Sequence, residues 1–336
     1  AYDSLTDSEK KQVTNYRTLL AAEKAYADIL KNAVKKLDDI YKTTGDYIEK
    51  LPGDELNAFG SEWYILGLAR SGRRVSDDYY KAIEKYVSEN IGENGRLDEK
   101  RATDNAKLVL VLSALDKDVT NVGGHDLLKA LSDMDYVTQQ GLSGAIYTLL
   151  AFDCRGYDIP SADKTAEQAS RDGLVEYILD KQLTDGGWAY SGDKAEPDMT
   201  AMALQALAAY YKTDAKVKEA VDKAVTCLST LQNTTGGYDS YGSVNSESAS
   251  QVITALTALG IDPDNDARFV KNGVSVLDSL CSFYVDGGGF RHVSDGKLDP
   301  TAAAQGYYAL AAYYRFTGGK TALYDMTDLN TLVKAA

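Results

Sequence analysis

Residues 178–211, ILDKQLTDGGWAYSGDKAEPDMTAMALQALAAYY, decide the fold, because the chain repeats them twice more in altered form. Gly187, Gly237 and Gly289 mark the same place in the three copies and lie 50 and 52 residues apart. A period near fifty predicts a repeat architecture in which each copy is one supersecondary unit. The other copies are residues 227–260, CLSTLQNTTGGYDSYGSVNSESASQVITALTALG, and residues 279–314, SLCSFYVDGGGFRHVSDGKLDPTAAAQGYYALAAYY.

Each copy predicts two unlike helices. The first is amphipathic, because its apolar residues recur at steps of three and four with charged residues between them, so that one face is buried. In the middle copy these residues are Val217, Val221, Ala224, Leu228 and Leu231. The second helix, MTAMALQALAAYY and its counterparts, is apolar nearly all round and is expected to be buried on most sides. An inner ring of buried helices within an outer ring of amphipathic ones satisfies both patterns.

Weaker copies fill the N-terminal half, with inner-helix candidates at residues 61–72, 102–115 and 141–152. Together the copies predict six hairpins and an all-α fold, an (α/α)6 toroid. An open superhelix of the same hairpins is the alternative. We expect a helical linker segment at residues 1–44, the toroid at 45–325 and a C-terminal tail at 326–336. The first segment could equally be a helix that simply packs onto the ring.

The composition excludes several classes of protein. The 50 acidic and 36 basic residues give a net charge of −14, and such a surface repels nucleic acid and anionic lipid. No run approaches eighteen apolar residues, so we expect no membrane insertion. The chain begins at Ala1 without a charged-then-apolar leader, which we interpret as the start of a mature or an expressed fragment, so the missing leader decides nothing about location.

The cysteines and acidic runs do not form a recognisable metal module. Cys154, Cys227 and Cys281 are odd in number and lack zinc spacing. They are expected to be buried thiols, although Cys227 and Cys281 fall at similar places in neighbouring repeats, which leaves a bridge between them open. DPDND at residues 262–266 hints at a calcium loop, but the glycine and glutamate of an EF-hand are missing, which favours an acidic turn. We therefore expect no metal and no cofactor.

The junction between the two helices of a copy carries a family resemblance. QLTDGGW, Gln182 to Trp188, has the frame Q-x-x-x-G-x-W, and LQNTTGGY repeats it from Gln232 to Tyr238, whereas YVDGGGF keeps the glycines and ends at Phe290. This pattern resembles the QW repeat of the terpene cyclases, whose toroid superfamily includes the protein prenyltransferases. The glycines allow a tight turn and the aromatic side chain packs between repeats, so the frame indicates the fold and no particular chemistry.

The N-terminal half adds a second resemblance. GSEWYILGLARSG, KDVTNVGGHDLLKAL and QGLSGAIYTLLAFD look like the toroid of bacterial surface proteins related to the cobalamin carriers, intrinsic factor and transcobalamin. The resemblance covers residues 45–325 and implies a corrinoid held between the toroid and a small β domain, which is not visible in this sequence.

The first thirty residues resemble the helical linkers of Gram-positive surface proteins. They imply an extracellular location at the cell surface or wall, with other domains as partners.

Acidic residues recur where the inner helices are expected to begin. EPDMTA at residues 196–201 resembles the D-x-D-D-T-A element of class II terpene cyclases, in which a carboxylic acid protonates an alkene or epoxide. Acids also recur at Asp104, Glu247 and Asp299, which favours helix capping over catalysis. The zinc pattern of the prenyltransferases and the C-G-E-Q of thioester domains are absent.

The aromatic and acidic residues are expected to gather at one mouth of the ring, where tyrosine offers both an apolar face and a hydroxyl to a sugar or amphipathic ligand. We predict a noncatalytic ligand-binding or adhesive module that binds a corrinoid or a glycan there. The alternative is a terpene-cyclase-like enzyme with Asp198 as general acid. The ligand-binding candidates are Trp63, Asp104, Trp188, Asp198, Tyr238, Tyr241, Glu247, Phe290 and Asp299.

Overall fold

The computed structural model describes Thr6, Lys10 and residues 16–329, and the chain divides into two compact units, residues 1–42 and 43–336. In its described part the first unit is helical, because α2 runs over Tyr16–Ile48 and only its last residues belong to the second unit. The predicted linker and tail lie partly outside the described residues, which omit 1–5, 7–9, 11–15 and 330–336.

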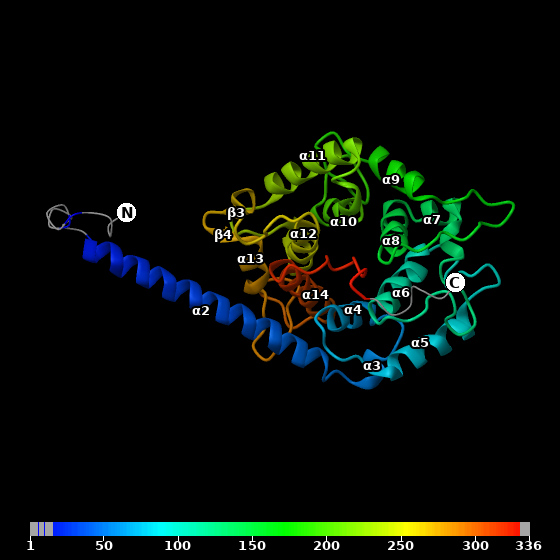
Figure 1. Ribbon diagram of the computed structural model, residues 1–336, viewed down its shortest axis with the longest axis horizontal. Helices are drawn as coiled ribbons and strands as arrows, with labels where there is room; N and C mark the ends of the chain where they lie inside the picture. The colour runs from blue at the N-terminus through cyan, green and yellow to red at the C-terminus, as the bar shows by residue number, and fades with distance from the viewer. Residues whose placement is uncertain (1–5, 7–9, 11–15, 330–336) are drawn as a thin grey trace. The chain divides into compact units, whose positions relative to one another are not determined.

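The second unit is a closed double ring of helices (Figure 1). Its inner helices are buried on nearly all sides, as their all-round apolar sequences predict. Each inner helix contacts the next one along the chain, and the last contacts the first. This closure confirms the (α/α)6 toroid and excludes the open superhelix. The inner helices are α4 Glu62–Arg70, α6 Ala102–Ala114, α8 Leu142–Asp153, α10 Pro197–Leu207, α12 Ser246–Ala258 and α14 Pro300–Thr317.

The two long outer helices, α5 (Asp77–Asn90) and α11 (Ala215–Leu231), are amphipathic. In α5, the buried residues Tyr79, Ile83 and Val87 recur every four positions and form one inward stripe. The other elements of the outer layer are α3 Gly53–Leu56, α7 Met134–Gln139, α9 Arg171–Asp180 and α13 Val276–Ser282, with the 3-10 turns η2 Ala130–Ser132, η3 Ala208–Tyr210 and η4 Ala267–Phe269.

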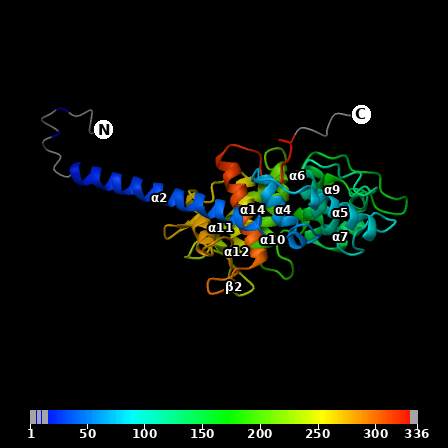
Figure 2. The same cartoon turned by 90° about the horizontal axis from the view of Figure 1, so that it is seen from below.

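Two short hairpins interrupt the helices. One pairs β1 (Asp239–Ser240) with β2 (Ser243–Val244), and the other pairs β3 (Val270–Lys271) with β4 (Val274–Ser275), both antiparallel. We call the side of the ring on which α10, α12 and α14 begin the entry face, and the side on which the inner helices end the exit face. In Figure 2 the β1–β2 hairpin projects from the entry face.

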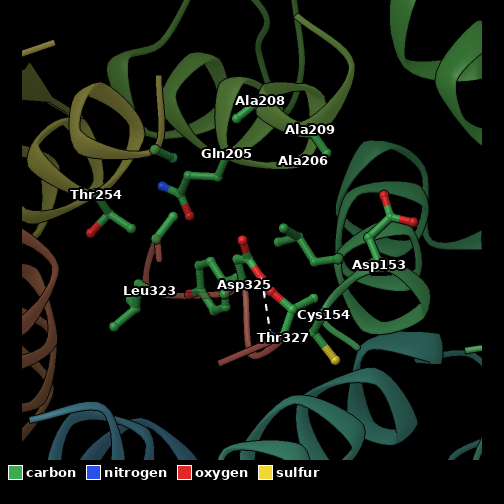
Figure 3. A pocket seen from close by; sticks show the side chains of 14 residues that line it. Asp153, Cys154, Gln205, Ala206, Ala208, Ala209, Thr254, Leu323, Asp325 and Thr327 are labelled. Atoms are coloured by element: carbon green, nitrogen blue, oxygen red, sulfur yellow. Dashed lines mark hydrogen bonds between the residues drawn. The ribbon is translucent and has the colours of Figure 1, made fainter. Parts of the chain in front are cut away.

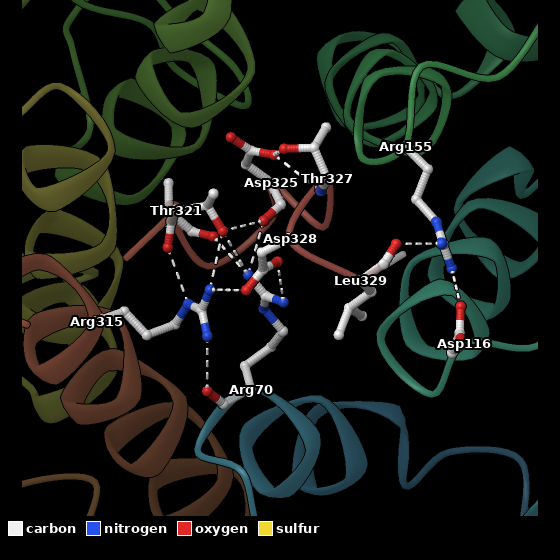
Figure 4. Close-up of polar contacts among 10 residues, drawn as sticks. Arg70, Asp116, Arg155, Arg315, Thr321, Asp325, Thr327, Asp328 and Leu329 are labelled. Carbon is white, nitrogen blue, oxygen red and sulfur yellow. Dashed lines mark hydrogen bonds and ion pairs between the residues drawn. The ribbon is translucent and has the colours of Figure 1, made fainter. Parts of the chain in front are cut away.

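A C-terminal plug, residues 320–329, covers part of the exit face (Figures 2 and 4). Leu323 and Met326 are buried in it, and the Met326 amide donates to the carbonyl of Cys154 at the end of α8 over 2.7 Å. The Arg70 guanidinium at the end of α4 donates to the carbonyl of Asp325 over 2.7 Å. The plug therefore joins the ends of α4 and α8, which are not neighbours in the ring, and part of it lies in the segment expected to be a tail.

No disulfide joins Cys227 to Cys281, which settles the pairing that the sequence left open. Within the described part of the chain, no helix combines the length and the apolar character needed to cross a membrane.

Candidate functional site

The QW frames hold neighbouring repeats together. The Gln182 amide donates to the carbonyl of Gly186 in its own turn and to that of Ala220 in α11, each over 2.8 Å. Gln232 makes the same pair of bonds to Gly236 and to Phe269, over 2.9 and 2.8 Å. One side chain thus fixes a tight turn and anchors it to the next hairpin.

Three of the aromatic candidates belong to this framework. Trp188, Tyr238 and Phe290 are each 0% exposed, so they cannot contact a ligand at the surface, and the structure corrects their assignment to a mouth. The Trp188 indole donates to the carbonyl of Ile178 at the end of α9 over 2.7 Å. Gly187 permits this close packing, because an added Cβ would lie 2.5 Å from the Cβ of Ala195.

Trp63 lies inside the ring. Its ring centroid is 5.7 Å from that of Tyr147 in α8 and 6.0 Å from that of Tyr308 in α14. Since only α6 separates α4 from α8 in the ring, the Trp63–Tyr147 contact lies inside the ring, beside α6. Lys107 of α6 lies 6.0 Å from the Trp63 ring.

An amide network also lies inside the ring. The Gln205 amide donates to the side-chain oxygen of Gln251 over 3.0 Å. The Gln251 amide in turn donates to the side-chain oxygen of Gln305 over 3.0 Å and to the Tyr308 hydroxyl over 2.7 Å. These residues link the last turn of α10 to the middles of α12 and α14, and a hydrogen-bonded network of this kind rigidifies the ring.

The four repeated acids do not share one role. Asp299 is the N-cap of α14 and accepts from the Ala302 amide over 2.9 Å, which confirms the capping interpretation for this residue. That interpretation is wrong for the others. Asp104 lies in the first turn of α6, whose N-cap is Arg101, and pairs with the Arg101 guanidinium over 3.1 Å. Burial raises the pKa of Asp104, although the positive charge of Arg101 lowers it. Asn245, not Glu247, caps α12.

Asp198 lies in the first turn of α10 without capping it. Its Oδ2 accepts from the Ser240 hydroxyl over 3.0 Å, whereas its Oδ1 is buried without a hydrogen-bond partner. Burial raises the pKa of this carboxyl, partly offset by the hydroxyls of Ser248 and Ser240. Asp198 therefore holds a proton more readily than an exposed aspartate does.

Glu247 lies in the first turn of α12 and pairs with a histidine that the sequence interpretation left without a role. His292 Nδ1 is 2.9 Å from each carboxylate oxygen of Glu247, and the Ser246 hydroxyl donates to the same group over 2.9 Å. The carbonyl of His292 accepts from the Ser246 amide over 3.1 Å. The loop before α14 is thereby tied to the start of α12.

Two tyrosines are exposed beside these acids. Tyr190 is 71% and Tyr241 85% exposed. The Tyr190 amide donates to a carboxylate oxygen of Glu196 over 3.0 Å. The Ser240 hydroxyl, one residue before Tyr241, donates to Asp198, which lies two residues after Glu196, so these hydrogen bonds place the four groups in one neighbourhood. The charge of Glu196 raises the pKa of Tyr241. We call Tyr190, Glu196, Asp198 and Tyr241 the tyrosine rim.

Tyr241 occupies an unfavourable backbone position. It has φ of 54° and precedes Gly242 with φ of 86° in the two-residue turn between β1 and β2. The corresponding turn between β3 and β4 contains Asn272 and Gly273 at 53° and 80°. Asn-Gly is the pair that such turns favour, because asparagine tolerates a positive φ and tyrosine does not. The sequence singled out Tyr241, whereas nothing in it indicated that Tyr190 would be exposed.

A partly open cavity of the ring lies away from Asp198. This cavity of about 320 Å³ is lined by the ends of α8, α10 and α12 and by the plug. Ala208, which lines it, follows Asp198 by ten residues, or about 15 Å along a helix axis. The buried acid and the cavity therefore belong to opposite faces of the ring.

The described residues contain no cluster of three or more His, Cys, Asp or Glu side chains able to hold a metal ion. In the run DPDND, Asp262 accepts from the Asp264 amide over 2.9 Å and from the Asn265 side chain over 3.0 Å. These bonds confirm the acidic turn in place of a calcium loop.

Comparison with solved structures defines the class of protein as an α/α toroid. The chain superposes on protein geranylgeranyltransferase-I of Candida albicans, solved with GGPP, with a TM-score of 0.53 and 13% identity over 83% of this chain and 91% of that one. It also resembles ent-copalyl diphosphate synthase from Streptomyces platensis, with a TM-score of 0.49 and 17% identity over 78% of this chain and 50% of that one. No family model and no curated protein sequence matches the chain.

Proposed function

We propose that this toroid is a noncatalytic binding module that recognises a glycan at the tyrosine rim of its entry face. The observation that carries the proposal is Tyr241, an aromatic side chain held 85% exposed at a backbone position that disfavours it. Strain of this kind persists where the surrounding structure maintains it and is concentrated at ligand-binding sites.

The chemistry of the tyrosine rim suits a sugar. Tyrosine presents an apolar ring face and a hydroxyl to the same ligand, and the ring faces of Tyr190 and Tyr241 can cover the C–H face of a pyranose. The carboxylates of Glu196 and Asp198 accept hydrogen bonds from hydroxyls. Because the rim is acidic, a neutral or amino sugar suits it better than a sulfated or uronic one.

The alternative is a terpene-cyclase-like enzyme with Asp198 as general acid, and the raised pKa of this carboxyl favours it. Such an acid has to meet its alkene in a chamber that excludes water. Trp63, Tyr147 and the amide network instead lie inside the ring, and the cavity of about 320 Å³ does not include Asp198. These features support binding over turnover.

We further propose that the module functions extracellularly, at the surface or wall of a Gram-positive bacterium, joined to other domains of a longer protein. Two features support this: the resemblance of the first thirty residues to surface-protein linkers, and the net charge of −14. The acidity disfavours nucleic acid as a partner.

A glycan array followed by calorimetry tests the proposal. We expect a glycan to bind the wild type, Tyr241→Ala to weaken it at least tenfold, and Tyr177→Ala on the outer helix α9 to leave it unchanged, since stacking contributes on the order of 1–2 kcal/mol per aromatic. A corrinoid that binds independently of Tyr241 contradicts the proposal. A polyprenyl compound that is turned over, with loss of turnover in Asp198→Asn, establishes the alternative.

A further inference from the structure

The cavity of the exit face is a second place where the molecule can hold a ligand (Figure 3). It measures about 320 Å³, about twice the 150 Å³ that accommodates a benzene molecule in a protein core. Small side chains create the space, because four of the positions that line the ends of α10 and α12 are alanines. They are Ala206, Ala208, Ala209 and Ala258.

The polar group at the inner wall is fixed as an acceptor. Gln205 is 6% exposed, and its amide nitrogen donates to the backbone and side-chain oxygens of Gln251 over 3.1 and 3.0 Å. Its side-chain oxygen accepts no hydrogen bond from any described residue. In Figure 3 that oxygen is directed into the space between α10 and the plug. A ligand in this space can therefore donate a hydrogen bond to Gln205 Oε1, which accepts none from the described residues.

The remaining surroundings carry negative charge. Asp325 of the plug lies at the opening, and only its Oδ1 is engaged, by the amide and hydroxyl of Thr327 over 3.1 and 2.6 Å. Three inner helices, α8, α10 and α12, end at the cavity, and the C-terminal end of a helix carries partial negative charge. No Lys, Arg or His is among the described residues that line it.

Two arginines that bond to residues lining the cavity are already engaged. The Arg171 guanidinium pairs with Asp153 over 2.6 Å, and the Tyr210 hydroxyl occupies the other oxygen of that carboxylate over 2.7 Å. Arg70 pairs with Asp328 over 3.0 Å and donates to carbonyls of the plug. Neither guanidinium lines the cavity.

We propose that this cavity binds a small organic cation, an ammonium group on an apolar body of about ten non-hydrogen atoms. The ammonium group donates to Gln205 Oε1 and faces the Asp325 carboxylate, while the body packs against the alanines and Leu323. The Tyr324 ring in the wall adds a favourable face for a cation. The site is independent of the glycan proposed for the entry face.

Ligand-observed NMR and calorimetry on the full chain test this with phenethylammonium and its uncharged counterpart 2-phenylethanol. We expect the ammonium compound to bind at least about tenfold more tightly, because only it gains the charge and the full donor set. Ala258→Leu fills the cavity and is expected to weaken binding at least about tenfold. Asp325→Asn, at an exposed position, is expected to weaken it about fivefold, as for a partly solvated charge pair.

The matched control is Asp295→Asn, an exposed aspartate in the loop before α14, which should leave binding unchanged. Equal affinity for the alcohol and the ammonium compound overturns the proposal, as does binding that neither Ala258→Leu nor Asp325→Asn weakens. Absence of binding at about 10 mM, the weakest affinity that a site of this size predicts, overturns it as well. Asp325→Asn keeps the test decisive if Ala258→Leu does not fold.

Discussion

Arg70 and Asp328 lie 258 positions apart and form a 3.0 Å ion pair in which the arginine side chain is only 2% exposed (Figure 4). Arg315 approaches the other oxygen of Asp328 to 2.6 Å, so one carboxylate pairs with two nearly buried guanidiniums. Arg70 is at the end of the first inner helix and Arg315 near the end of the last. The pair of contacts therefore fastens the plug at the seam where the ring closes.

Asp328→Asn should destabilise the fold by about 2 kcal/mol at pH 7. Removing one partner of a buried pair costs about 3–5 kcal/mol, and partial exposure of Asp328 reduces that cost. Chemical denaturation measures the effect, with Asp295→Asn as an exposed control that should stay within about 0.5 kcal/mol of the wild type. Equal stability of Asp328→Asn and wild type would show that the clamp does not hold the plug.

The same residue sets a dependence on pH. Burial alone would raise the pKa of Asp328. The hydrogen bonds and charges of Arg315 and Arg70 outweigh burial and lower this pKa from 3.8 to about 2. Because the folded pKa is depressed, this contribution to stability is present above about pH 4 and is lost as the pH falls towards 2. Between these limits the wild type should lose stability more steeply than Asp328→Asn.

Trp188→Phe should cost about 2 kcal/mol of stability and leave glycan affinity unchanged. The substitution removes the 2.7 Å bond from the indole to Ile178 and part of a fully buried side chain. Thermal unfolding measures the first effect, and calorimetry well below the melting temperature measures the second. A selective loss of affinity in a stable protein would assign Trp188 to the binding site after all.

The sequence predicted the ring well because its signals are periodic. The repeat of about fifty residues, the two helix types and the QW frames each follow from spacing, and all six inner helices lie where these signals put them. The plug has no such signal. Leu323, Tyr324 and Met326 show neither helical nor strand periodicity, so only the tertiary structure reveals that they are buried.

The repeated acids show a second limit of sequence reasoning. Asp299 and Asp198 both neighbour the proline that begins their helix, yet Asp299 precedes it and is the N-cap, whereas Asp198 follows it, two positions past the N-cap, with an unpartnered oxygen. Both helices begin at the proline, so the role of the acid depends on which side of the proline it lies. A displacement of two residues along the chain changes that role entirely.

Asp198→Asn should stabilise the protein at pH 7 by about 1 kcal/mol, the lower cost of an unsatisfied buried acceptor. Burial raises the pKa of Asp198, so the folded state favours the neutral carboxyl and ionisation above pH 3.8 costs stability. The gain should therefore vanish near pH 3, where both side chains are neutral. Asp299→Asn is the control, since asparagine caps a helix as well as aspartate does and should change little at either pH.

Tyr241→Asn should separate stability from binding. Asparagine tolerates the positive φ of this turn, so the variant should be more stable than the wild type by about 1 kcal/mol, the cost of placing an ordinary residue in the left-handed region. It also removes the most exposed aromatic of the tyrosine rim, so glycan affinity should fall at least about tenfold. Thermal unfolding and calorimetry on the same preparation measure both changes.

The second hairpin provides the reciprocal control. Asn272→Tyr places a tyrosine at φ of 53° in a turn of the same type between β3 and β4, away from Glu196 and Asp198. It should lower stability by about 1 kcal/mol and leave glycan affinity unchanged. If Tyr241→Asn instead lowers stability, the tyrosine is held by packing, and its exposure no longer argues for a ligand. If it raises stability without loss of affinity, the glycan site must lie elsewhere on the ring.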